Sequence, residues 1–537
     1  MEGKWTAGLM MALAALVLLC GGQAAVGETA GDGTGMDPED WADQNRVFYE
    51  IFVGSFSDSD GDGIGDLRGM IRRMDYLNDG NPESETSLGI GGIWLTPVFP
   101  SPSYHKYDVT DYETVDPAFG SEEDLKELIR LCHERDVKLI LDLPLNHTGR
   151  EHAWYRNFLE AHRAGETDSV WYDFYTWIGE GESVPPGRRF MQEEGMLVEA
   201  NFSDSMPELN YDCAAVREAA LKIARKYLEM GVDGFRFDAA RYLYLGENDR
   251  NISFWGWYMD ELRKINPKVY AVAEVWDSET VANLYAKSVN CFRFGTAQAE
   301  GLIAKTAKGG NVNRLTKNTE EYWLTIRSIN PFAIHIPFIS NHDMDRAAGY
   351  LQNRGGKMAM AANLYLLTPG SPFIYYGEEI GLRGSRGGAE TDANRRLHMQ
   401  WGDGDTVADP EGSDYGSQTE ETVRSQMEKQ GSLLKHYQKI LRIRREHPGI
   451  ANGAYQALDF GDTKMGGFLC TWRGNTTAVF HNPTGGPLTV NLAEATEAPL
   501  TRIAAIIGTQ DEGAAELNGT ELTLGAMTSA VLEEGKE

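Results

Sequence analysis

The sequence predicts an α/β fold, a closed (β/α)8 barrel with a small subdomain inserted after the third strand and a carboxyl-terminal antiparallel β-sandwich domain. From residue 46 onward, short apolar runs alternate with amphipathic helical stretches, which indicates parallel strands joined by crossovers. A polar, aromatic-rich segment interrupts this alternation at 148–210. After Pro448, glycines, threonines and short alternating runs replace the helical pattern. These three observations define the predicted architecture.

Eight apolar runs supply the expected barrel strands, at 47–53, 92–95, 138–142, 234–238, 269–274, 290–294, 336–341 and 372–375. Helical patterns between and after them lie at 122–135, 214–230, 255–265, 357–367 and 432–446. Eight strand–helix units fit a closed barrel better than an open sheet.

The remaining domains follow from changes in pattern. The segment 148–210 is too long for a loop between a strand and a helix, so we expect a subdomain over the barrel mouth. The runs GGFLCTW, TTAVFHN and LTVNL alternate as antiparallel strands do. The expected limits are 41–147 and 211–449 for the barrel, 148–210 for the subdomain and 450–537 for the β domain.

The first residues are typical of an export signal. Lys4 precedes the apolar stretch 9–19, which is too short to span a bilayer comfortably. We expect a signal peptide at 1–20, a flexible linker at 21–40, and an extracellular or cell-surface protein. Cys20 resembles a bacterial lipoprotein attachment site, which would give a membrane tether, but Leu19 stands where such sites carry a small residue. Cleavage around 24–27 is the alternative.

Composition excludes some classes of protein. The chain has 537 residues, 42% of them hydrophobic, which is ample for a large core. A formal net charge of −30 argues against a nucleic-acid partner, because that binding relies on Lys and Arg at phosphates. Four scattered cysteines, Cys132, Cys213, Cys291 and Cys470, fit neither a disulfide framework nor a zinc site, so we expect buried free thiols.

Three carboxylates, Asp238, Glu274 and Asp343, stand where apolar runs end, in GFRFDAAR, VYAVAEVW and HIPFISNHD. Carboxyl ends of barrel strands meet at one face, so three such residues on separate strands indicate a shared site, although one alone could be a strand cap. Cleavage of a glycosidic bond needs an acid, a nucleophile or base, and a counter-charge. The pattern therefore favours a glycosidase.

Neighbouring residues support this chemistry. Arg236 lies two residues before Asp238, on the same face of its strand, where it would keep the carboxylate ionised or form a purely structural ion pair. The apolar run before Glu274 would raise its pKa and suit a general acid. His342 precedes Asp343 and suits either sugar hydroxyls or a capping turn. Tyr107, in SYHKYD, could stack on a sugar or belong to the core.

A second cluster predicts structural calcium. Asp58, Asp60, Asp62 and Asp66, with the Ile64 carbonyl, place oxygen ligands at alternate positions around glycines. The twelfth position is Gly69 and not Glu, which argues against an EF-hand. A solvated acidic turn is the alternative.

Taken together, the motifs resemble those of the α-amylase family, glycoside hydrolase family 13. DLPLNH, MPELN, GFRFDAARY, AEVW, FISNHD and GSPFIYYGEEIG occur in the family's order. The resemblance implies that Asp238 is the nucleophile, Glu274 the general acid/base and Asp343 the transition-state stabiliser. It also implies substrate-binding roles for Arg236, His147, His342, Tyr107 and Asp108.

The expected activity is retaining hydrolysis of α-1,4 bonds in starch or maltodextrins by a monomer. Alternatives are an exo-acting α-glucosidase, an oligo-1,6-glucosidase, or an inactive glycan-binding homologue, although such homologues usually lose a carboxylate. Arg241 and Tyr242 replace the Lys-His of many amylases on the leaving-group side, which leaves product pattern and transglycosylation open.

Overall fold

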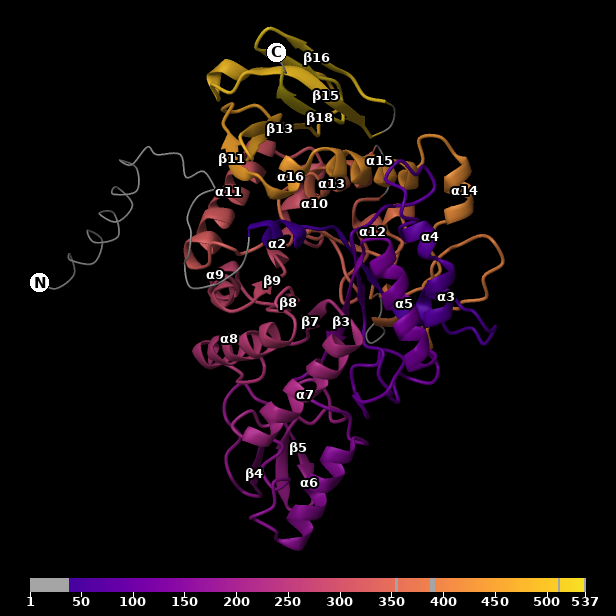
Figure 1. The fold of residues 1–537 in the computed structure, drawn as a ribbon, viewed down its shortest axis with the longest axis vertical. Coiled ribbons are helices and arrows are strands. Elements are labelled where there is room, and N and C mark those ends of the chain that lie inside the picture. The colour runs from indigo at the N-terminus through magenta and orange to yellow at the C-terminus, as the bar shows by residue number, and fades with distance from the viewer. Residues whose placement is uncertain (1–37, 353–355, 387–391, 510–511, 536–537) are drawn as a thin grey trace, which may run out of the picture.

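The structure is a computed structural model that describes residues 38–352, 356–386, 392–509 and 512–535. The expected signal peptide and Cys20 lie outside these residues, and residues 38–40 of the expected linker begin helix α2 (Pro38–Asp43). Along the long axis of the molecule, the carboxyl-terminal sheets occupy one end, the barrel the middle and the inserted subdomain the other end (Figure 1). Among the described residues, no helix combines the length and the apolar character that a membrane span requires.

The centre of the molecule is a curved parallel sheet of seven strands in the order β10-β1-β2-β3-β7-β8-β9. Their bounds are β1 (Phe48–Ile51), β2 (Gly92–Leu95), β3 (Lys138–Leu143), β7 (Gly234–Phe237), β8 (Tyr270–Ala273), β9 (Asn290–Cys291) and β10 (Phe373–Tyr375). Nearly every residue in these strands is buried, because side chains fill the barrel and helices cover its outside. This explains the continuous apolar runs of the sequence.

The expected seventh strand at 336–341 is wrong in detail, because no regular strand forms there. Pro337 has no amide hydrogen to donate to a neighbour. The chain nevertheless lies between β9 and β10. The Ile336 carbonyl accepts from the Arg293 amide at 2.9 Å, and the Pro337 carbonyl accepts from the Phe373 amide at 3.0 Å. The predicted barrel class is confirmed, with an irregular segment in place of the seventh strand.

Helices surround this sheet. They are α3 (Leu67–Arg72), α4 (Met74–Leu77), α5 (Glu122–Glu134), α7 (Ala214–Met230), α8 (Asn248–Ile265), α9 (Glu279–Leu284), α10 (Leu302–Ala307), α11 (Val312–Ile329), α12 (Ala347–Tyr350), α13 (Lys357–Leu366), α14 (Val423–Glu428), α15 (Leu433–Glu446) and α16 (Pro448–Asn452). All five expected helices form. α8 starts seven residues before its predicted first residue, 255, and α11 lies where no helix was expected.

The segment between β3 and α7 holds α6 (Ala153–Ala164) and a three-stranded sheet, β4 (Trp177–Gly179), β5 (Phe190–Glu193) and β6 (Met196–Glu199). Backbone hydrogen bonds tie it to the end of β3. The Leu209 amide donates to the Asn146 carbonyl at 2.9 Å, and the Thr148 amide donates to the Pro207 carbonyl at 3.2 Å. This connection fixes the backbone on both sides of His147.

Two antiparallel sheets form the carboxyl-terminal part, with the strand orders β11-β12-β13-β18-β15 and β14-β17-β16. Their bounds are β11 (Ala454–Leu458), β12 (Gly466–Trp472), β13 (Asn475–Asn482), β14 (Leu488–Asn491), β15 (Leu500–Gly508), β16 (Ala515–Asn518), β17 (Glu521–Leu524) and β18 (Thr528–Glu534). A separate cluster of buried apolar side chains from both sheets forms their common core, as the predicted sandwich requires.

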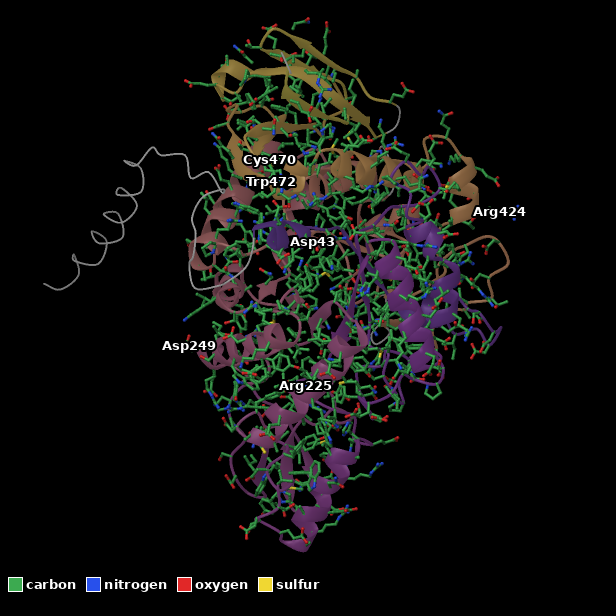
Figure 2. The ribbon with its side chains drawn as sticks, viewed as in Figure 1. Asp43, Arg225, Asp249, Arg424, Cys470 and Trp472 are labelled. Atoms are coloured by element: carbon green, nitrogen blue, oxygen red, sulfur yellow. The ribbon has the colours of Figure 1, made fainter. Side chains whose placement is uncertain are left out.

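The larger of these sheets packs on the barrel. The Trp41 and Trp472 ring centroids lie 6.4 Å apart, and the Asn313 side-chain Nδ2 donates to the Met465 carbonyl at 3.1 Å. Figure 2 shows Cys470 and Trp472 at this junction. Cys132, Cys213, Cys291 and Cys470 are all free thiols, and all but Cys213 are buried, as expected.

Candidate active site

The carboxyl ends of three neighbouring strands meet at one buried guanidinium. Arg236, on β7, pairs with Asp238 at 2.6 Å, with Glu274 at 2.7 Å and with Asp142 at 2.8 Å. Asp142 belongs to β3, while Asp238 and Glu274 directly follow β7 and β8. Asp238 and Glu274 contact different nitrogens of the same group, Nη1 and Nη2. Their carboxyl groups are therefore near neighbours.

The turn after β7 brings Asp238 and Glu274 together. Ala239 adopts a left-handed backbone conformation with φ of 47°, which is uncommon for a residue other than glycine. In this conformation its amide donates to Glu274 Oε2 at 3.2 Å, and the next amide, of Ala240, donates to the Glu274 carbonyl at 3.0 Å. Backbone strain of this kind is often found at functional sites.

Asp343 joins the same cluster through cations. Its carboxylate contacts His342 Nε2 at 3.0 Å and Arg396 Nη2 at 2.8 Å. The His342 ring stacks on Tyr107, with centroids 5.5 Å apart, and the Tyr107 hydroxyl donates to Asp142 at 2.8 Å. A continuous set of polar contacts thus links Asp343 to Arg236.

The three carboxylates differ in their access to solvent. The Asp343 side chain is 30% exposed, whereas those of Asp238 and Glu274 are 11% and 14% exposed. All three thus keep some exposed surface, while the guanidinium that pairs Asp238 with Glu274 is 1% exposed.

Burial and neighbouring charges shift the pKa values of the three carboxyl groups differently. Burial, with the charges of Asp238 and Asp343, raises the pKa of Glu274 to about 7. Burial, with the charges of Asp142 and Asp343, also raises the pKa of Asp238. Burial would raise the pKa of Asp343 too, but the His342 and Arg396 cations outweigh it and hold that pKa well below its usual value. The arrangement provides a protonated acid beside two carboxylates.

His342 carries a positive charge in this setting. Burial would lower its pKa, but the carboxylates of Asp343 and Glu50 outweigh burial and raise the pKa of His342 to about 10. Its Nδ1 lies 2.6 Å from Glu50 Oε1. Its Nε2 lies 3.0 Å from Asp343 and 2.7 Å from the Tyr107 hydroxyl, so both N–H groups of His342 are used within the protein, and its role is to hold Asp343 ionised.

Two predicted substrate-binding residues lie outside this contact network. His147 is buried, its Nε2 has no hydrogen-bond partner among the described residues, and its ring packs 5.5 Å from Phe202. Burial lowers the pKa of His147 to about 4, so the imidazole is neutral and free to bind a hydroxyl. Asp108 accepts hydrogen bonds from Ser101, at 2.5 Å, and from Ser103, and so braces its own loop.

One exposed aromatic ring lies beside the cluster. Trp276, two residues after Glu274, is 44% exposed and stacks on Phe294. Arg241 forms an ion pair with Asp277 at 2.6 Å and donates to the Trp276 carbonyl at 3.2 Å. Arg241 therefore supports the loop that carries Trp276.

Sequence reasoning gave no role to three residues of this network. Asp142 stood in a motif but was not named as a site residue. Glu50 was detectable as the one charged residue within the apolar strand β1. Arg396 lies in a polar loop after β10, and no local pattern marks it.

The acidic loop after β1 forms a compact group of oxygens. Ligand oxygens of Asp58, Asp60 and Asp66 all lie within 4.8 Å of one another. Asp58 is buried and accepts from the Gly61 and Gly63 amides at 2.7 and 2.9 Å, which folds the loop around it. Asp62 is outside this group and accepts from the Ile64 amide at 2.7 Å. Three carboxylates at this spacing fit a hard divalent cation.

Comparison with known proteins agrees with this geometry. The family model described as "Alpha amylase, catalytic domain" matches residues 50–453. Alpha-amylase 3 of Dictyoglomus thermophilum is 35% identical over 451 residues, which cover 82% of this chain and 85% of that protein. The structure titled "Eubacterium rectale Amy13B" is 31% identical, with a TM-score of 0.84, and the match covers 92% of this chain and 96% of that one. The α-amylase of H. orenii is 35% identical, with a TM-score of 0.77, over 92% of this chain and all of that one.

More distant relatives carry other names. A 4-alpha-glucanotransferase of Thermotoga neapolitana is 28% identical, with 82% of this chain and 96% of that protein covered. An oligo-1,6-glucosidase of Bacillus cereus is 27% identical, with 79% of this chain and 87% of that protein covered. The likeness thus spans several glucan-modifying activities.

Proposed function

Because this chain belongs to the α-amylase family of glycoside hydrolases, we propose that it is a retaining hydrolase that cleaves α-1,4 bonds of starch and maltodextrins. The observation that carries the proposal is the shared contact of Asp238 and Glu274 with Arg236. Retaining glycosidases need their two carboxyl groups about 5–5.5 Å apart, and contact with the two terminal nitrogens of one guanidinium supports a close spacing of this kind.

In the proposed first step, Asp238 attacks the anomeric carbon while Glu274 protonates the leaving oxygen. Arg236 keeps Asp238 ionised in spite of its raised pKa, because it is the nearest cation, at 2.6 Å. The bond to the leaving sugar breaks and a glycosyl ester with Asp238 forms. Asp343 stabilises the positive charge that develops on the sugar ring, since His342 and Arg396 hold it ionised.

In the proposed second step, water replaces the leaving sugar. Glu274, now ionised, removes a proton from this water as it attacks the same carbon, which releases Asp238 and restores the protonated acid. Two displacements at one carbon retain its configuration. Retention is therefore a direct consequence of assigning Asp238 as nucleophile.

Endo action separates this proposal from the exo-acting alternatives. A maltodextrin whose non-reducing end is chemically blocked should be shortened by the wild-type protein, because an endo-acting hydrolase does not require a free chain end. The measurement is reducing sugar released and product length over time, with the unblocked maltodextrin as control. An exo-acting α-glucosidase or oligo-1,6-glucosidase would leave the blocked chain intact.

We propose that the loop of Asp58, Asp60 and Asp66 holds a structural calcium ion. The donor set supports this, because carboxylate oxygens are the ligands calcium prefers, and the loop supplies no group to the carboxylate cluster around Arg236. Thr406 donates to Asp58 at 2.7 Å, so the loop is joined to the polar segment that follows β10. The ion would stabilise this junction and take no part in bond cleavage.

Removal of calcium should lower the midpoint of thermal unfolding. A ligand bound only by the folded state adds about 2.7 kcal/mol when its free concentration is 100 times its Kd. Asp60→Asn should lower the midpoint in calcium but not in EGTA, and Asp62→Asn is the matched control, because Asp62 lies outside the group of three. Equal midpoints for the wild type in calcium and in EGTA would contradict the site.

Export is part of the proposal, since a starch hydrolase acts where its polymer is found. It is supported by the leader-like residues 1–20, with Lys4 before an apolar stretch. Acylation of Cys20 and cleavage around 24–27 remain alternatives that mass spectrometry of the mature amino terminus would distinguish.

A further inference from the structure

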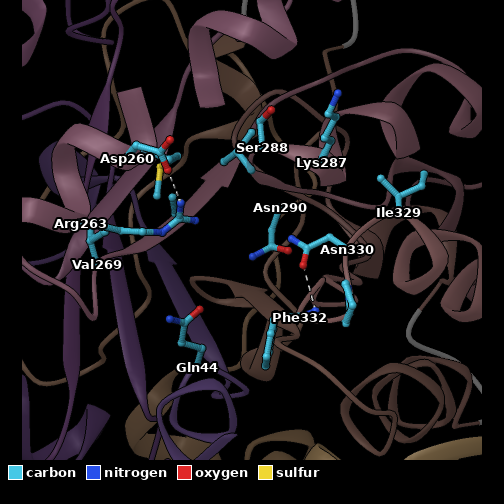
Figure 3. Close-up of a pocket in the computed structure, with 14 residues that line it drawn as sticks. Gln44, Asp260, Arg263, Val269, Lys287, Ser288, Asn290, Ile329, Asn330 and Phe332 are labelled. Atoms are coloured by element: carbon cyan, nitrogen blue, oxygen red, sulfur yellow. Dashed lines mark hydrogen bonds and ion pairs between the residues drawn. The ribbon is translucent and has the colours of Figure 1, made fainter. Parts of the chain in front are cut away.

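A cavity of about 290 Å³ lies at the amino-terminal end of the barrel, away from the carboxylate cluster. It is lined by Val269, just before β8, and by Asn290, the first residue of β9. Asp238 and Glu274, in contrast, follow the last residues of β7 and β8. The cavity is therefore separated from the active site by the length of the strands. Figure 3 shows its lining residues.

Gln44 presents a buried side chain without a protein partner to this cavity. The residue is 9% exposed, and its side-chain amide makes no hydrogen bond within the described part of the chain. Its backbone is fixed, because its amide donates to the Trp41 carbonyl at 3.1 Å and its carbonyl accepts from Ser371. Gln44 lines the cavity, and its amide atoms are not among the side-chain polar atoms that the described residues cover completely. This amide is thus positioned for a ligand or for water.

Further polar groups face the cavity from other sides. Asn290 uses its oxygen to accept from the Ile334 amide at 2.9 Å, which leaves its two Nδ2 hydrogens unused. Arg263 pairs with Asp260 through Nη1 at 3.2 Å, and its remaining donors make no other hydrogen bond or ion pair within the described ranges. Figure 3 shows Gln44, Asn290 and Arg263 around the hollow.

One half-buried ring completes the wall. Phe332 is fixed at its backbone, because its carbonyl accepts from Trp41 Nε1 at 3.0 Å and its amide donates to Asn330 at 2.9 Å. An aromatic ring beside amides and an Arg–Asp pair is a combination that suits sugars. The ring packs on C–H groups, and the amides and the ion pair exchange hydrogen bonds with hydroxyls.

We propose that this cavity is a second carbohydrate site, which binds the end of a maltooligosaccharide. The choice of ligand rests on the proposed function. An anion is disfavoured, because Arg263 is already paired with Asp260, Lys287 is exposed, and the chain carries a net charge of −30. Ligand pockets usually measure about 300–1,000 Å³, so this cavity suits one or two sugar rings and not a long chain.

The test is a calorimetric titration with maltotriose of the full chain carrying Asp238→Asn, which prevents turnover. Two classes of site are expected, one at the carboxylate cluster and one at the cavity. Adding Gln44→Ala should weaken only the second class, by about tenfold, as expected for the loss of hydrogen bonds to one amide. Gln192→Ala, an exposed glutamine of β5, is the matched control and should leave both classes unchanged. Because Gln44 makes no side-chain bond to the protein, its variant should unfold at the same temperature as its parent.

Two results would overturn the inference. One is a single class of maltotriose site that Gln44→Ala does not alter. The other is displacement of maltotriose from the second class by inorganic phosphate, which would make the cavity an anion site. Neither result bears on the proposed activity, which is tested separately by the release of sugar from starch by the wild-type chain.

Discussion

Asp238→Asn should reduce the release of sugar from starch by at least about a thousandfold, because in the proposed mechanism the Asp238 carboxylate forms the glycosyl ester. The amide keeps the size of the carboxylate and removes its charge. The measurement is kcat/KM on a linear maltodextrin under conditions where both proteins are folded.

Asp249→Asn is the matched control for this variant. Asp249 is an exposed carboxylate at the start of α8, and it should tolerate the same chemical change without loss of activity. A loss of less than about tenfold for Asp238→Asn would remove Asp238 from the role of nucleophile.

Glu274→Gln should lower activity on maltodextrin by about a hundred- to ten-thousandfold, the usual contribution of a general acid. The loss should be much smaller on α-maltosyl fluoride, because fluoride leaves without protonation. Azide should restore turnover of that substrate, since it attacks the glycosyl ester without needing a base. Glu218→Gln, on the exposed face of α7, is the control. Equal losses on maltodextrin and fluoride would contradict the acid/base assignment.

The pH dependence of the wild type follows from the same residue. Glu274 must be protonated to act as acid, and burial with two nearby carboxylates raises its pKa to about 7. The value of kcat/KM on maltodextrin should therefore fall as the pH rises through about 7. At low pH, kcat/KM should also fall, because Asp238 becomes protonated and can no longer attack. This fall should occur at a higher pH than for an ordinary aspartate, because burial raises the pKa of Asp238. The measurement is the pH profile of Glu274→Gln on α-maltosyl fluoride. If kcat/KM of this variant still falls as the pH rises through about 7, a group other than Glu274 causes the fall.

Much of the fold was predictable because the barrel strands are buried on both faces and so appear as apolar runs. The start and end of β2 agree with the prediction, as do those of α7. The run at 336–341 was equally apolar, but Pro337 removes a ladder donor, and hydrogen bonding decides whether a run becomes a strand. A run of apolar residues in the sequence indicates that a segment is buried, but it does not indicate which backbone hydrogen bonds the segment forms.

The candidate site was predictable to the extent that its residues end strands. Asp238, Glu274 and Arg236 follow from position alone, because parallel strands bring their carboxyl ends together. Arg396 and Glu50 could not be found in this way, since their contacts with Asp343 and His342 span 53 and 292 residues of sequence. The cavity beside Gln44 depends likewise on segments far apart in the chain, and no local motif marks it. The domain limits and the individual roles of the site residues stay predictions.

The central claim is that Asp238 forms a covalent bond to the sugar, and trapping that ester tests it most directly. The wild-type chain would be treated with 5-fluoro-α-glucosyl fluoride, which forms the ester readily and releases it slowly, then digested and analysed by mass spectrometry. We expect one added fluoroglucosyl group, on the peptide that contains Asp238. A label on a different carboxylate, or α-linked substrate converted to β-configured product without any label, would contradict the account.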